Sequence, residues 1–203
     1  MFGKLFVFEG PDGVGKTTLS KAATDLLSAA GQSSQWLSFP GREPGTLGHL
    51  VYQVHHQPRQ FNIDHLTDAA KQALHIAAHL DAIEQRIKPL LASGHNVVLD
   101  RFWWSTWVYG VTAGLDPGFL QALIEVEKLA WRDVAPACIV LVTTNAPRDR
   151  AGEELATWRT LADNYRALAA RESSTFVVRT YDNSASLSAA QDFLTSLLLP
   201  SGT

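Results

Sequence analysis

The segment that most constrains this chain is Gly10–Thr17, with the sequence Gly-Pro-Asp-Gly-Val-Gly-Lys-Thr. It fits the pattern G-x-x-x-x-G-K-[S/T], and it follows an apolar run and precedes helix-forming sequence. Glycines allow the backbone to curl until several N–H groups point at one phosphate, and the dipole of the following helix adds positive charge. We therefore interpret the segment as a phosphate-binding loop rather than a chance glycine turn.

Two residues of this loop and one later pair are candidates for ATP and magnesium chemistry. Lys16 is expected to reach the β- and γ-phosphates of ATP, and Thr17 to offer its hydroxyl to Mg²⁺. Asp100-Arg101 ends a later apolar run, where Asp100 is expected to support the magnesium shell; a surface ion pair is the alternative. ATP and Mg²⁺ are thus the expected cofactors. The residues expected to contact them are Gly10, Pro11, Asp12, Gly13, Val14, Gly15, Lys16, Thr17, Thr18 and Asp100.

Short apolar runs alternate with longer helical patterns along the chain. Runs such as Val97–Leu99 and Ile139–Val142 are continuous, which suits parallel strands covered on both faces. We predict an α/β fold, a doubly wound five-stranded parallel sheet flanked by helices, with ligands at the carboxyl ends of the strands. The predicted strands are Lys4–Phe8, Gln35–Phe39, Asn96–Asp100, Ala137–Thr143 and Thr175–Thr180. The predicted helices span about 16–30, 45–56, 63–92, 117–132, 153–171 and 185–198.

Composition narrows the class of protein further. The 203 residues contain no repeat or linker and predict one domain, residues 1–203. A net charge of −3 shows no basic excess, so we expect no nucleic-acid partner. No apolar stretch reaches roughly 18 residues and no signal-peptide pattern is seen, so we expect a cytoplasmic protein without a membrane partner. The one cysteine, Cys138, lies in an apolar run and is expected to be a buried structural thiol.

Four segments, in the same order, resemble the thymidylate kinase family and its nucleoside monophosphate kinase relatives. They are Phe8–Thr18, Phe39–Thr46 (Phe-Pro-Gly-Arg-Glu-Pro-Gly-Thr), Ile87–Gly94 and the strand end Val97–Phe102. The resemblance implies a P-loop kinase that moves the γ-phosphate of ATP to a small-molecule acceptor, a (deoxy)nucleoside monophosphate. Relatives of this kind are often dimers, so it also implies a possible homodimer.

The resemblance assigns roles to single residues. Asp12 is implied to face the acceptor, while Arg42 and Arg101 are implied to hold its phosphate from two sides. A guanidinium fork suits that task because it binds two phosphate oxygens at once. Glu43 is either a turn residue or a partner of Arg42.

The family's arginine-rich lid follows the fourth strand, and the segment in that place here, about 144–153, is shorter. Arg148 and Arg150 are candidates for a charge on the transferring phosphate, with Arg159 as a further candidate; exposed arginines on a surface turn are the alternative. The residues expected to act in catalysis are Lys16, Asp12, Arg101, Arg148 and Arg150.

The pocket for the acceptor's base departs from the family pattern. The family places an aromatic residue that stacks on thymine and an arginine four positions later. Counting back from Ile87-Lys88-Pro89 puts Ile76 and Leu80 at these positions, on one helix face. His75 and His79 are also four residues apart. Either one is a candidate to read a base or phosphate, and the alternatives are a helix cap or a side chain that faces solvent. A metal site made by the two histidines is disfavoured, because the sequence offers no further ligands with them.

Three tryptophans follow Arg101, and Trp103 or Trp104 is interpreted as a stacking wall, with helix core as the alternative. The residues expected to bind the acceptor are Asp12, Phe39, Arg42, Ile76, His79, Leu80, Arg101, Trp104 and Tyr109. A modified or non-thymine nucleotide remains open as acceptor. So do a kinase of a nucleoside or other small alcohol, and a nucleotide-binding regulatory protein whose kinase activity has decayed.

Overall fold

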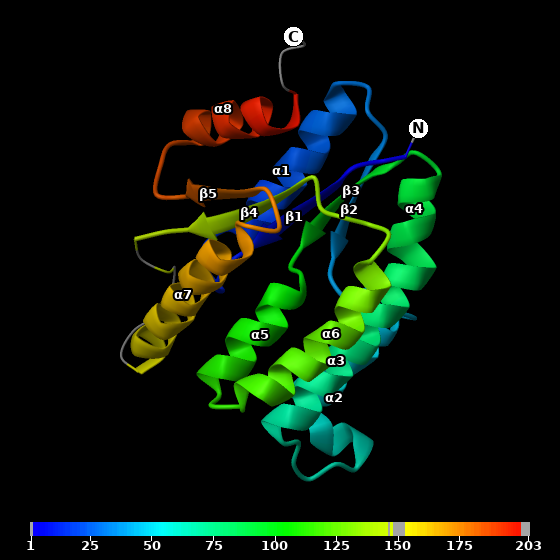
Figure 1. The fold of residues 1–203 in the computed structure, drawn as a ribbon, viewed down its shortest axis with the longest axis vertical. Helices are drawn as coiled ribbons and strands as arrows, with labels where there is room; N and C mark the ends of the chain where they lie inside the picture. Colours follow the sequence, from blue (N-terminus) through cyan, green and yellow to red (C-terminus); the bar gives the residue numbers. More distant parts are fainter. Residues whose placement is uncertain (1, 146, 148–152, 200–203) are drawn as a thin grey trace.

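A computed structural model of the chain describes residues 2–145, 147 and 153–199. Its centre is a sheet of five parallel strands in the order β2-β3-β1-β4-β5 (Figure 1). The predicted α/β fold with a doubly wound parallel sheet is confirmed. The strands are β1 Leu5–Glu9, β2 Ser34–Ser38, β3 Asn96–Asp100, β4 Cys138–Thr143 and β5 Val178–Asp182.

Helices cover both faces of the sheet. Helices α1 (Lys16–Ala29) and α8 (Leu187–Leu198) lie on one face, and most of the others lie on the opposite face (Figure 1). The other helical segments are α2 Leu47–His56, η1 Pro58–Phe61, α3 Asp68–Ala82, η2 Ile83–Ile87, α4 Lys88–Ala92, α5 Trp103–Thr112, α6 Pro117–Trp131 and α7 Glu153–Glu172.

The central strand β1 shows why the apolar runs are continuous. Leu5 and Val7 pack into the hydrophobic cluster on the α5 and α6 side of the sheet. Phe6 and Phe8 point the other way, into the cluster beneath α1 and α8. Because both faces of the strand are buried, both sets of alternating positions from Leu5 to Phe8 are apolar.

Apart from shifts of one or two residues at other ends and the short η1, the structure differs from the predicted elements in three places. The predicted helix 63–92 begins only after Thr67, whose side chain accepts a hydrogen bond from Ala70 N, and it is divided by the π-turn η2. The π-turn ends at Ile87, two residues before Pro89, which has no N–H to continue the α-helical ladder. Helix α5 was not among the predicted helices, because its aromatic sequence carries no helical periodicity of polar residues. Strand β5 begins at Val178 instead of Thr175, since the end of α7 and its turn occupy the residues before it.

Strand register brings the candidate residues to one edge of the sheet. Phe8 of β1 pairs with Asp100 of β3, and Glu9 pairs with Leu141 of β4. The glycine loop that follows β1 therefore lies beside the Asp100-Arg101 step that follows β3, as the parallel topology requires.

Candidate active site

The loop between β1 and α1 has the backbone of a phosphate-binding loop. Gly10 and Gly15 have φ of 140° and 88°, values that favour glycine. A Cβ at Gly10 would collide with Val142 O, and one at Gly15 would collide with the Asn183 side chain. Among the described residues no side chain caps α1, whereas Thr46, Thr67, Asp116 and Ser186 cap other helices. The N–H groups of the first turn of α1 thus face the loop and not a side chain.

Lys16, the first residue of α1, is folded back over the loop. Its Nζ donates a hydrogen bond to Pro11 O at 2.8 Å and lies 3.9 Å from Asp12 Oδ1. Burial, together with repulsion by Arg101, lowers the pKa of Lys16 to about 7, against the attraction of Asp12 and Asp100. Burial makes this lysine easy to deprotonate. A polyanionic ligand bound beside it would raise its pKa again and stabilise its charged form.

Thr17 and Asp100 bring two oxygen atoms together beside the loop. Thr17 Oγ1 donates to Asp100 Oδ2 at 2.5 Å, across the gap between α1 and the end of β3. Hydroxyl and carboxylate oxygens are ligands that Mg²⁺ prefers, and Mg²⁺ in nucleotide sites usually takes only one or two from the protein. The described part of the chain contains no group of three or more His, Cys, Asp or Glu that could hold a metal ion.

Asp12 is tied to the acceptor side of the site. Its carboxylate forms an ion pair with Arg101 Nη2 and accepts a hydrogen bond from Tyr109 OH at 2.7 Å. Trp158 Nε1 donates to its backbone carbonyl at 2.8 Å. Arg101 has a φ of 86°, uncommon for a residue with a side chain, and its Nη1 also donates to Ser105 Oγ at 2.9 Å. Residues from the loop, from the step after β3, from α5 and from α7 are therefore joined in one network.

Glu9 is a buried carboxylate that the sequence analysis did not single out. Its oxygens accept hydrogen bonds from Phe102 N at 2.7 Å and from Ser105 N and Oγ at 3.1 and 2.9 Å, so Glu9 caps α5 from another strand. Burial raises the pKa of Glu9, while Arg101 and Lys16 oppose the rise. The one available signal was an acidic residue at the end of an otherwise apolar strand, directly before the glycine loop.

A cavity of about 500 Å³ opens next to this network, between α2, α3 and α5. It is lined by six of the residues expected to bind the acceptor: Asp12, Phe39, Arg42, His79, Arg101 and Tyr109. Lining residues that the sequence analysis did not propose include Tyr52, His55, Lys71, Gln72, Ser105 and Thr106. The cavity is a mixed polar and aromatic space with cations at several points of its wall, suited to an aromatic anion.

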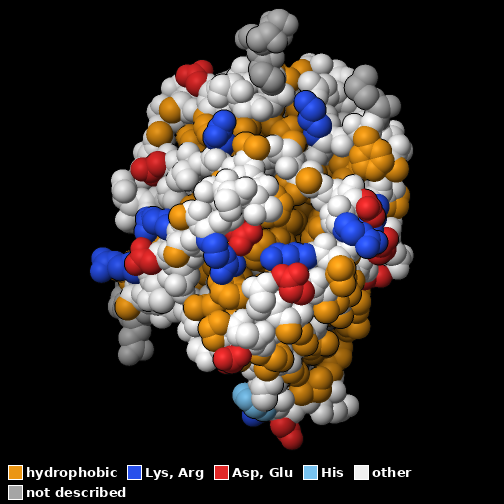
Figure 2. All heavy atoms as spheres, in the orientation of Figure 1, with side chains coloured by type: hydrophobic (Ala, Val, Ile, Leu, Met, Phe, Trp, Pro, Cys, Tyr) orange, Lys and Arg blue, Asp and Glu red, His pale blue; other side chains and the backbone are white. Residues whose placement is uncertain are grey.

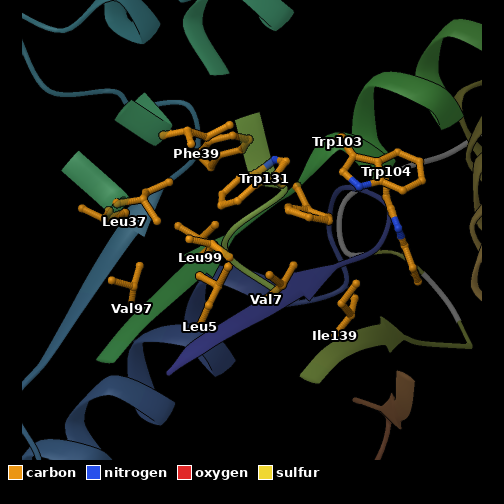
Figure 3. Packing of buried hydrophobic residues seen from close by; sticks show 14 of the residues in the cluster. Leu5, Val7, Leu37, Phe39, Val97, Leu99, Trp103, Trp104, Trp131 and Ile139 are labelled. Carbon is orange, nitrogen blue, oxygen red and sulfur yellow. The ribbon is translucent and has the colours of Figure 1, made fainter. Parts of the chain in front are cut away.

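Three expected acceptor contacts do not line this cavity. Ile76 and Leu80 each follow a cavity-lining histidine, His75 or His79, by one residue. One residue turns a helix by about 100°, so Ile76 and Leu80 point to a neighbouring face of α3. The cavity-lining face of α3 instead carries Asp68, Gln72, His75 and His79, spaced three or four apart. Trp104, like Trp103, packs into the core against the sheet (Figure 3) and is fully buried, so the helix-core alternative describes both.

Two further expectations concern charged residues at the edges of the site. Glu43 pairs with Arg86, whose Nη1 lies 3.0 Å from Glu43 Oε2, and not with Arg42. Arg42 is exposed and lies over the ring of Tyr52, at 5.2 Å from its centroid. Arg148 and Arg150 lie outside the described residues, and Arg159 is exposed on α7.

Two of the histidines that line the cavity, His55 and His75, are neutral at neutral pH. His55 Nδ1 lies 3.2 Å from His75 Nε2, close enough for a hydrogen bond between the two rings. Burial, together with the nearby His79 and His55, lowers the pKa of His75 to about 3. Burial also lowers the pKa of His55. These two rings therefore offer neutral hydrogen-bonding groups at neutral pH.

Comparisons with known proteins point in one direction. A sequence profile of the family described as thymidylate kinase matches residues 8–185, a span that holds the loop and the whole cavity lining. The thymidylate kinase of Alcanivorax borkumensis is 31% identical over 213 residues, covering 98% of this chain and 97% of that protein. The thymidylate kinase of Nitrobacter winogradskyi is 31% identical over 195 residues, covering 87% of this chain and 80% of that protein. No helix within the described residues is long and apolar enough to cross a membrane.

Proposed function

The chain belongs to the thymidylate kinase family, which makes it an ATP-dependent nucleoside monophosphate kinase, and we propose that Gly10–Thr17 holds the donor while the cavity beside it holds the acceptor. One observation carries this division of the site. Asp12 is a residue of the phosphate loop, and it also lines the cavity and pairs with Arg101 there. Donor and acceptor would therefore meet at Asp12, as direct transfer between them requires.

The charges around this meeting point suit phosphoryl transfer. Bringing two polyanions together needs cations and positioning more than covalent chemistry from the protein. Lys16 would neutralise the donor's terminal phosphates from the loop side. Arg42 and Arg101 would hold the acceptor's phosphate from the cavity side, where both line the wall.

Mg²⁺ fits the same arrangement. Thr17 and Asp100 would hold it beside the donor's phosphates, through the two oxygens that lie 2.5 Å apart in this structure. Bound Mg²⁺ would neutralise charge that develops on the transferring phosphate. The proposal that the lid arginines Arg148 and Arg150 add further charge rests on the sequence alone.

A homodimer through α6 is the oligomeric state we propose. Phe119, Val126 and Leu129 on this helix are 39%, 48% and 66% exposed. Figure 2 shows hydrophobic side chains gathered over the region where Figure 1 draws α6 and α3. Light scattering of the purified protein tests this directly: a dimer mass that Leu129→Glu converts to a monomer mass supports it, and a monomer mass for the unmodified chain contradicts it.

Release of ADP, measured over a panel of nucleosides, nucleoside monophosphates and modified pyrimidine nucleotides, tests the proposed reaction. Turnover should depend on a monophosphate acceptor and should vanish in Lys16→Ala. Arg42→Ala should raise KM for the monophosphate and leave KM for ATP unchanged. Turnover with nucleosides that is indifferent to Arg42→Ala would instead identify a nucleoside kinase. Nucleotide binding without acceptor-stimulated turnover would identify a regulatory protein.

A further inference from the structure

Two carbonyl groups of the phosphate loop are held by side chains that come from outside the loop. Trp158 Nε1 on α7 donates a hydrogen bond to Asp12 O at 2.8 Å. Asn183 Nδ2, on the turn after β5, donates a hydrogen bond to Val14 O, also at 2.8 Å. The two donors lie 146 and 169 positions further along the chain than the carbonyls they hold. The tertiary fold, and not the sequence of the loop itself, therefore makes these contacts.

Holding a carbonyl group also fixes the direction of the next N–H group. In a planar trans peptide unit, the C=O of one residue and the N–H of the following residue point in opposite directions. A carbonyl turned toward a donor outside the loop therefore turns the next N–H inward, where a phosphate binds. The N–H groups directed in this way belong to Gly13 and Gly15. Their φ values of 84° and 88° lie in the left-handed region that favours glycine.

Both side-chain donors are themselves fixed in place. Trp158 is 4% exposed and packs in the same hydrophobic cluster as Val14 of the loop. The backbone N–H of Asn183 donates to Thr143 O at 2.8 Å, which attaches Asn183 to the end of β4. The loop is therefore held by the buried core on one side and by the edge of the sheet on the other.

A third carbonyl of the loop is held in a different way. Pro11 O accepts its hydrogen bond from Lys16 Nζ, which belongs to the loop motif itself. The phosphate oxygens of a bound nucleotide would compete with Pro11 O for this ammonium group. They would not compete for the indole of Trp158 or the amide of Asn183, which approach the loop from outside. These two contacts can therefore persist while the nucleotide is bound.

We propose that Trp158 and Asn183 are positioning residues of the donor site. They keep the N–H groups of Gly13 and Gly15 directed at the phosphates of ATP. The loop is then ordered before the nucleotide arrives, so binding does not carry the cost of ordering it. This inference rests on the proposed function of Gly10–Thr17 and names the residues outside the motif that complete the donor site.

The test measures the binding of ATP and of inorganic tripolyphosphate by calorimetry in the presence of Mg²⁺. Tripolyphosphate reports on the loop alone, because it lacks the base and the sugar. Trp158→Phe removes the indole N–H and keeps an aromatic ring, and it should weaken the binding of both ligands at least about fivefold, the scale of one hydrogen bond. Asn183→Ala should weaken both in the same way. Trp36→Phe is the matched control, since it removes an indole hydrogen bond of the same length, 2.8 Å, to Ser20 Oγ and should leave both affinities unchanged.

The pattern of losses separates positioning from a general loss of stability. Trp158→Phe and Trp36→Phe should both lower the thermal midpoint, and a loss of tripolyphosphate affinity in Trp158→Phe alone supports the inference. If Trp158→Phe does not fold, Asn183→Ala decides by itself. Unchanged tripolyphosphate affinity in both loop variants, or a loss confined to ATP, would overturn the inference and leave the proposed function standing. An unmodified protein that does not bind ATP would overturn both.

Discussion

The two halves of the site are built in opposite ways. The loop Gly10–Thr17 is one continuous segment, and what it offers a phosphate is largely backbone N–H groups and one lysine. The acceptor cavity is a set of side chains from the loop, the end of β2 and helices α2, α3 and α5. The loop needs glycines and a strand and helix to hold it, while the cavity needs correct packing of several separate elements.

The two halves of the site therefore differ in how selective they can be for a ligand. A backbone cradle recognises the phosphates that every nucleoside triphosphate shares, and its residues are fixed by chain geometry. A wall of side chains can change its ligand through single substitutions, because each lining side chain makes its own contact. Asp12 and Arg101 join the two halves, so substitutions on either side of this pair should have separable effects.

The largest effect is expected from breaking the loop. Lys16→Met should lower kcat by about a thousandfold, because the buried ammonium is replaced by an apolar group of similar length. Steady-state ADP release with saturating acceptor measures this. Lys21→Met is the matched control on the same helix, where the lysine is exposed and lies over Trp36. A loss of less than about tenfold in Lys16→Met would remove Lys16 from the proposed chemistry.

The next effect comes from breaking the cavity side. Arg101→Ala should cost about 2–3 kcal/mol in kcat/KM for the acceptor, the scale of a charge acting on a transferring phosphate. Arg101→Lys should recover only part of this, since an ammonium cannot make the fork contacts to Ser105 and Asp12. Arg166→Ala, which removes an exposed ion pair with Asp163, is the control. Near-normal kcat/KM in Arg101→Ala would refute its role.

The same contrast explains what the sequence could predict. The parallel sheet and the phosphate loop follow from local signals, namely continuous apolar runs and a motif of fixed spacing. Strand β3 is predicted at its observed bounds, Asn96–Asp100. Helix α5 was missed because Trp103–Thr112 is apolar nearly all round, and its start is capped by Glu9 from a distant strand.

The cavity was harder to predict because its lining depends on helix rotation. An error of one residue along α3 replaces His75 and His79 by Ile76 and Leu80, which is enough to exchange a cavity face for its neighbour. Glu127 of α6 forms a hydrogen bond with His79 and lies 48 residues from it in sequence, so no local pattern links them. Such partners become visible only once α3 and α6 are packed together.

Stability against pH gives a third and smaller effect on the loop side. Burial lowers the pKa of Lys16 to about 7, against about 10.4 in an unfolded chain. Below pH 7 Lys16 is protonated in both the folded and the unfolded state, so folding carries the full free-energy cost of burying its charge. Between about pH 7 and 10 the unfolded chain binds the extra proton, so this cost disappears as the pH rises.

Lys16→Met lacks this cost and should be more stable than the unmodified protein at pH 6.5, by about 1–3 kcal/mol. The difference should shrink toward pH 10. Urea unfolding at pH 6.5, 8 and 9.5, without nucleotide, measures it. A difference that stays constant over this range would show that Lys16 does not change its protonation there.

The smallest effect concerns Tyr109, which connects the two halves through Asp12. Tyr109→Phe removes one hydrogen bond to a carboxylate and should cost about 1 kcal/mol in kcat/KM for the acceptor. Burial raises the pKa of Tyr109 to about 12, so its hydroxyl stays a donor and the loss should be the same from pH 6 to 9. Tyr181→Phe is the control, since within the described residues the buried Tyr181 hydroxyl has no hydrogen-bond partner. An equal loss in both variants would mean that removing a buried hydroxyl, and not the contact with Asp12, causes the effect.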